Sequence, residues 1–145
     1  MPDRRKIHVI SALMAEDVRQ EISGMHSVIG LLSGKMVVGG LPVVMPKLVF
    51  RIEYESNETF SADCRLTLLS PTENRALTVV AHARIDKDLR NIFVGGWTPV
   101  QFTELGRYSV LLQIGDQQER SLNSFEIVAA QPNVVSAEGP PALNP

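Results

Sequence analysis

Three consecutive segments decide the fold: KLVFRIEYE (47–55), FSADCRLTLL (60–69) and RALTVVAHARI (75–85). In each segment apolar and polar side chains alternate with the period of two residues that a β-strand imposes. The first segment, for example, places Leu48, Phe50 and Ile52 on one face, and Arg51 and Glu53 on the other. Three such strands in a row indicate an antiparallel sheet that packs on one side and meets solvent on the other.

The alternation continues in the C-terminal third, where we expect strands over residues 97–103, 107–114 and 117–128. The N-terminal part is less regular, and there we expect strands over residues 6–13, 27–32 and 35–38. Pro99 places the strand 97–103 near a sheet edge. We expect connections at 39–46, which carries the chain from one sheet to the other, and at 86–96, which closes with Gly95-Gly96. About nine short strands separated by turn signals predict an all-β, antiparallel two-sheet sandwich.

One segment departs from this period. Met14, Val18 and Ile22 are spaced by four residues, which suits a short helix near residues 14–22. An irregular connection fits the same residues.

Length and composition are those of one globular domain. The chain has 145 residues, 44% of them hydrophobic, enough to form a core without a metal or a disulfide. We divide it into an N-terminal arm (1–5), a sandwich domain (6–129) and a flexible proline-containing tail (130–145). A single cysteine, the lack of a cleavable leader pattern and a first apolar stretch too short to span a bilayer predict a cytoplasmic protein.

A short motif near the C-terminus sharpens the fold. Glu104-Leu105-Gly106-Arg107-Tyr108 resembles the turn that precedes the penultimate strand of immunoglobulin domains. In those domains the tyrosine hydroxyl bonds back to the upstream backbone and forms a "tyrosine corner". Val110 stands where the disulfide cysteine would be. The resemblance implies an immunoglobulin-like sandwich.

Three stretches resemble an uncharacterised bacterial family of β-sandwich proteins: 16–24 leading into 27–30, Leu41-Pro42 with 45–48, and 102–108 followed by Asp116. The resemblance covers roughly residues 7–128 and implies a fold but no activity. A lysine often follows the glycine that matches Gly24 in this family, whereas here the residue is Met25.

The sequence contains no recognisable catalytic motif. Gly-x-Ser-x-Gly and phosphate-loop patterns are absent, and the three histidines show no metal-ligand spacing. Cys64 falls on a dry face, so we expect a buried, inert thiol. We therefore expect no enzyme activity and no cofactor. The net charge of −2 lacks the basic excess typical of a nucleic-acid binder, and we expect no membrane partner.

Two groups of residues are candidate partner-binding sites. Glu16, Asp17, Arg19 and Glu21 form a charged cluster in a connection at one end of the sandwich, where such domains commonly bind partners. A solvated turn is the alternative interpretation. Phe93 and Trp97 are large side chains of the kind that dominate interfaces, and core packing is their alternative.

These observations favour a non-enzymatic protein-interaction or assembly module with a protein partner or a second copy of itself. A structural component of a larger particle, such as a phage or secretion-type assembly, is one alternative. A domain that binds a small ligand or carbohydrate is another.

Overall fold

The computed structural model describes residues 5–131, and these residues form strands and connections without a helix. The four-stranded sheet has the order β2 (His26–Leu31), β1 (Ile7–Gln20), β5 (Leu48–Ser56) and β8 (Asn91–Trp97). The five-stranded sheet has the order β3 (Lys35–Val38), β11 (Arg120–Ala129), β10 (Gly106–Ile114), β6 (Phe60–Leu69) and β7 (Ala76–Ile85). A two-stranded ribbon pairs β4 (Val43–Met45) with β9 (Val100–Phe102).

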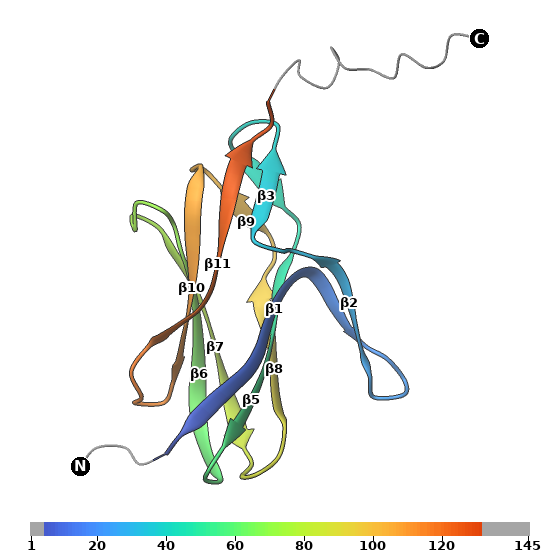
Figure 1. The fold of residues 1–145 in the computed structure, drawn as a ribbon, viewed down its shortest axis with the longest axis vertical. Coiled ribbons are helices and arrows are strands. Elements are labelled where there is room, and N and C mark those ends of the chain that lie inside the picture. The colour runs from blue at the N-terminus through green and yellow to red at the C-terminus, as the bar shows by residue number, and fades with distance from the viewer. Residues whose placement is uncertain (1–4, 132–145) are drawn as a thin grey trace.

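Every strand pair is antiparallel except β3–β11. The two main sheets enclose one core, as expected of a β-sandwich (Figure 1). The predicted N-terminal arm (1–5) and tail (130–145) lie largely outside the described residues.

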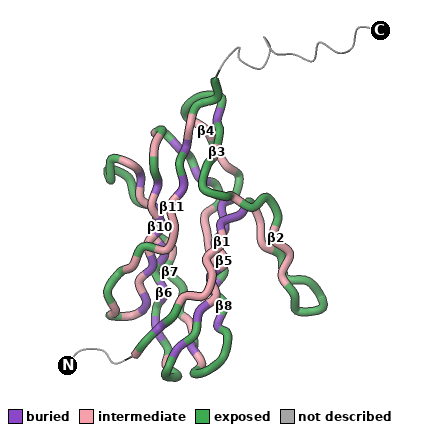
Figure 2. Tube along the Cα trace, in the orientation of Figure 1, coloured by how far each residue is buried: buried purple, intermediate pink, exposed green. Residues whose placement is uncertain are grey.

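The alternation at 47–85 is confirmed by burial. In β6 the side chains of Ala62, Cys64, Leu66 and Leu68 are buried, and their neighbours along the strand are more exposed. Figure 2 shows the same change of burial class along the central strands. Phe50 and Ile52 of β5 join the buried cluster from the other sheet, so the core lies between the two inner faces.

The predicted helix near residues 14–22 is wrong. β1 continues as a strand to Gln20, and its residues pair with β2 up to Gln20–His26. Ladder hydrogen bonds to a second strand satisfy the backbone here, and they override the weak preference that the four-residue spacing suggested.

The long connection predicted at 86–96 is also wrong over its second half, because Asn91–Trp97 is strand β8, paired with β5. The strand predicted at 97–103 is interrupted at Thr98-Pro99, and its second part is β9. The connection predicted at 39–46 contains the short strand β4, and it does lead from the five-stranded sheet to the four-stranded one.

The tyrosine corner is present. Tyr108 is buried, and its hydroxyl donates a hydrogen bond to the Glu104 carbonyl oxygen over 3.0 Å. Its ring stacks on Phe125 at a centroid distance of 5.4 Å and meets Phe102 edge-on. The side chain therefore fixes the entry to β10 and fills the core at once.

Tyr108→Phe tests the hydroxyl separately from the ring. We expect the free energy of unfolding to fall by about 1 kcal/mol, the usual contribution of one buried hydrogen bond. Tyr108→Leu, which also removes the stacking on Phe125, should cost more. Urea unfolding followed by tryptophan fluorescence measures both, and an unchanged midpoint for Tyr108→Phe would contradict a stabilising role of the hydrogen bond.

Gly96 allows β5 and β8 to approach closely. A Cβ atom at this position would lie 2.0 Å from the Leu48 carbonyl oxygen and 2.9 Å from the Val49 Cα, and both are backbone atoms. We expect Gly96→Ala to destabilise the fold by about 1–3 kcal/mol through overpacking. Gly39→Ala is the matched control, because nothing lies within 4 Å of its added Cβ. Equal urea midpoints for the two variants would refute this role of Gly96.

Candidate functional site: a projecting β-hairpin

The charged cluster lies on a hairpin that leaves the body of the sandwich. β1 pairs with β5 from Ile7–Ser56 to Ala15–Val49, and beyond Ala15 its described strand partner is β2 alone. Residues 16–31, called here the projecting hairpin, therefore extend the four-stranded sheet beyond the body of the sandwich (Figure 1). Met14 and Ala15 are buried where the two pairings meet, and the Leu32 amide donates to the Met14 carbonyl oxygen over 2.9 Å.

Asp17 connects the root of the hairpin to the body. Its carboxylate accepts hydrogen bonds from Lys47 Nζ at 2.7 Å and from Arg19 Nε at 2.8 Å. These two cations lower the pKa of Asp17 from its ordinary value to about 2. Ion pairs at such exposed positions add little stability, but they can fix an orientation. The pair Asp17–Lys47 thus orients the hairpin relative to the start of β5.

A groove of about 460 Å³ lies at this root. Glu16, Asp17 and Arg19 line one side together with Ile29, and the other side is formed by Met45, Pro46 and Lys47. The groove combines charged groups with apolar surface, which suits a segment of another polypeptide better than a compact small molecule.

Glu16 lies across Gly30 of the neighbouring strand. A Cβ at Gly30 would come within 2.6–2.7 Å of the Glu16 side chain, and the φ of Gly30 is +67°. Glycine is therefore required there twice, by the backbone angle and by the close approach. The consequence is a carboxylate held against Gly30, one residue before the end of β2.

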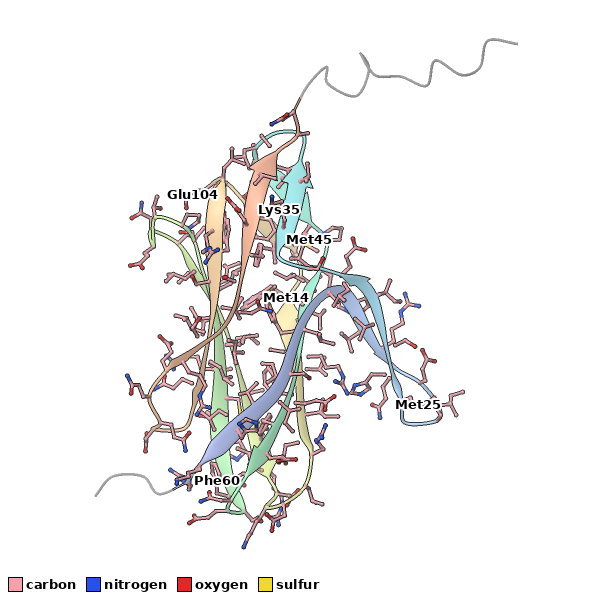
Figure 3. The ribbon with its side chains drawn as sticks, in the orientation of Figure 1. Met14, Met25, Lys35, Met45, Phe60 and Glu104 are labelled. Carbon is pink, nitrogen blue, oxygen red and sulfur yellow. The ribbon has the colours of Figure 1, made fainter. Side chains whose placement is uncertain are left out.

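The far end of the hairpin is apolar and exposed. Ile22 is fully exposed at 108% and Met25 is exposed at 69%. The turn that carries them is ordered by backbone bonds from Glu21 N–H to the Met25 carbonyl oxygen and from Gly24 N–H to the Glu21 carbonyl oxygen. Figure 3 labels Met25 at this end and Met14 at the bend where the hairpin begins.

A second contact holds the hairpin beside the sheet. Arg51 Nε on β5 donates to His26 Nδ1 on β2 over 2.8 Å. The Arg51 guanidinium also pairs with Glu53, which accepts a further hydrogen bond from Arg90 at 3.0 Å. The hairpin is therefore linked to the outer face of the four-stranded sheet through polar side chains rather than through a core.

The structure brings the four charged candidates together, because Glu16, Asp17 and Arg19 lie on β1 and Glu21 begins the turn. It does not bring Phe93 and Trp97 to them. Phe93 is only 6% exposed and lies in the core. Trp97 is half-buried, and its ring meets Phe50 edge-on at 5.6 Å. Its buried Nε1 has no hydrogen-bond partner within residues 5–131.

Sequence reasoning missed the residues that give the hairpin its character. The four-residue spacing predicts a helix that ends at Ile22, three residues before Met25, although the Ser23-Gly24 pair between them is a turn signal. Lys47 lies 30 residues from Asp17, and no local pattern indicates that contact.

The remaining candidates for chemistry give no second site. Cys64 is buried, and burial raises the pKa of its thiol. His82 is exposed and lies 3.0 Å from an Asp63 oxygen on the neighbouring strand. Within residues 5–131 no group of three or more His, Cys, Asp or Glu side chains is placed to hold a metal ion. The same residues contain no helix with the length and hydropathy needed to cross a membrane.

This geometry defines an all-β sandwich protein with a projecting hairpin. The chain belongs to a family of unknown function, DUF6941, whose model matches residues 10–125. No curated protein matches the sequence. A solved structure of a β-glucosidase from Erythrobacter marinus is similar over 86% of this chain, with a TM-score of 0.47 and 8% identity. The chain spans only 16% of that enzyme's length, and a likeness this distant carries no argument about function.

The Asp17 contacts predict a specific titration. Because the folded-state pKa is lowered, the ion pairs stabilise the fold above the unfolded-state pKa of about 3.9, and this contribution is lost as the pH falls toward 2. We expect Lys47→Gln to raise the Asp17 pKa toward its ordinary value, as measured by carboxyl ¹³C NMR. Lys87→Gln, a control that removes the same charge elsewhere, should leave it unchanged. An Asp17 pKa that ignores Lys47→Gln would contradict the contact.

Proposed function

We propose that this protein is a non-enzymatic interaction or assembly module that binds a protein partner, or a second copy of itself, through the projecting hairpin. One observation carries the proposal: Ile22 and Met25 are exposed at the end of a hairpin that stands away from the body. Large apolar side chains grouped on such a projection are typical of a contact surface.

The energetics of the hairpin support the same proposal. An isolated two-stranded hairpin is marginally stable, and ordering its backbone costs conformational entropy. The free energy of the polar contacts Asp17–Lys47 and Arg51–His26 offsets little of that entropy cost. A segment that adds so little to the core is better explained by binding than by stability.

The charge of the hairpin narrows the kind of partner. Glu16, Asp17 and Glu21 outweigh Arg19, so the segment is acidic. Acidic groups repel both nucleic-acid phosphates and anionic lipid surfaces, which favours a protein partner. The proposal places the module in the cytoplasm, where the single buried thiol of Cys64 needs no disulfide partner. The tyrosine-corner bond of Tyr108 supports the immunoglobulin-like variety of sandwich within this proposal.

Ile22→Ser/Met25→Ser tests the proposal, with Leu89→Ser as the control. Leu89 is 59% exposed on a different connection, so its replacement removes a similar exposed surface without touching the hairpin. Tagged full-length protein is used to capture partners from an extract of the native host, and bound proteins are quantified by mass spectrometry. We expect wild type and the control to retain the same partner and the double variant to lose most of it.

Circular dichroism verifies that the double variant is folded. If a folded double variant captures as much partner as wild type does, Ile22 and Met25 at the tip of the hairpin take no part in binding, and the proposal in this form is wrong.

A further inference from the structure

β2 is the outer strand of the projecting hairpin and has one free side. It is an edge of the four-stranded sheet and pairs with β1 alone among the described residues. An edge strand exposes a row of unpaired backbone N–H and C=O groups that can accept another strand. β8, the other edge of this sheet, contacts β7 and lies within the body, whereas β2 stands off it (Figure 1).

β2 lacks the features that usually protect an edge. Its sequence, HSVIGL, contains no Lys, Arg, Asp, Glu or Pro, and Ile29 and Leu31 are exposed. The edges of the other main sheet differ from it. β3 has only four residues and begins with Lys35, and β7 carries the charged Arg84. Natural sheets generally have short edge strands, or edge strands with charged side chains, and these features prevent pairing with another chain. An unprotected, projecting edge strand therefore indicates a site for pairing with a further strand.

The charges around β2 indicate what pairs with it. The Glu16 side chain lies against Gly30, one residue before the end of β2. Glu16 forms no ion pair within residues 5–131, whereas Arg19 attracts Glu21 and pairs with Asp17. In the β1–β2 register Asp17 and Ala15 face Ile29 and Leu31, so Glu16 lies on the opposite face of the hairpin from these two apolar side chains. One uncompensated carboxylate on one face and exposed apolar side chains on the other therefore characterise β2.

We propose that β2 accepts an extended segment of a partner protein as an added strand, and that apolar residues alternate with Lys or Arg along this segment. Its backbone pairs with the free side of β2, its apolar side chains cover Ile29 and Leu31, and its cations, which project from the opposite face, meet Glu16. The inference rests on the proposed function, because it names the kind of partner that the projecting hairpin binds.

Fluorescent eight-residue peptides and the full chain test the inference by anisotropy. In the first peptide valine alternates with lysine; in the second glutamate replaces lysine; in the third a proline replaces one central valine. We expect saturable binding of the lysine peptide and at least ~10-fold weaker binding of the other two, because one loses charge complementarity and the other loses a ladder hydrogen bond. Hydrogen exchange should show new protection of the amides at residues 27–31.

The role of Glu16 is tested with Glu16→Gln. We expect roughly 2- to 5-fold weaker binding of the lysine peptide, since one exposed ion pair is lost. Glu58→Gln removes the same charge from an exposed position outside the hairpin and should change the affinity little. Equal weakening by both substitutions, equal binding of the proline peptide, or protection that falls outside residues 27–31 would each overturn the inference.

The two proposals fail in different ways. If the lysine peptide does not bind but Ile22→Ser/Met25→Ser still abolishes capture of the native partner, strand addition is wrong and the proposed function stands. If the peptide protects residues 27–31 while capture ignores the tip substitutions, strand addition stands and the tip has no part in it.

Discussion

The change of partner along β1 is the constraint on which the candidate site depends. Up to Ala15 this strand belongs to the sandwich, because β5 pairs with it and the side chain of Met14 enters the core. Beyond Ala15 the same strand has only β2 beside it.

The hydrogen bond from the Leu32 amide to the Met14 carbonyl oxygen closes the base of the hairpin, where the chain re-enters the body of the sandwich. One continuous strand thus serves as both a core element and the stem of a projection. This continuity couples the hairpin to the fold without a separate domain.

The body of the fold could be predicted because its strands face a core on one side. Burial requires an apolar side chain at every second position of such a strand. Ala62, Cys64 and Leu66 of β6 follow this pattern. The projecting hairpin has no dry face. Its second strand is predicted at 27–32 and is β2, but the end of β1 carries no period of two. Met14, Val18 and Ile22 then suggested a helix, although the first is a core residue and the last is fully exposed.

The glycine pair at β8 gives a misleading signal of a different kind. In the sequence Gly95-Gly96 indicates the close of a connection, because glycine most often marks turns. In the structure Gly96 lies within a strand, and its lack of a Cβ permits the approach to the Leu48 carbonyl oxygen. A requirement for close approach has no signal in a single sequence, because it depends on a residue 48 positions away.

The candidate site was predicted in part for the same reason. The charged residues are neighbours in sequence, so their grouping on one element followed from the chain itself. Phe93 and Trp97 are candidates because of their size, but a large side chain suits a core as well as an interface, and the side chain of Phe93 packs in the core. Only the burial of each side chain distinguishes a core residue from an interface residue. That burial follows from the alternation along β8, and the sequence does not predict β8 because Gly95-Gly96 resembles a turn.

The way in which the hairpin is held is compatible with the proposed binding role. Its links to the body are hydrogen bonds and ion pairs at the surface, Asp17 with Lys47 and His26 with Arg51. Such contacts orient the hairpin relative to the body but contribute little free energy of folding. A binding partner could therefore replace them at little cost. Segments with few buried apolar contacts have the lowest local stability in a fold, and binding elements are commonly found among such segments. A partner that covers the exposed apolar groups would supply the burial that the hairpin lacks, and the sandwich behind it would remain unchanged.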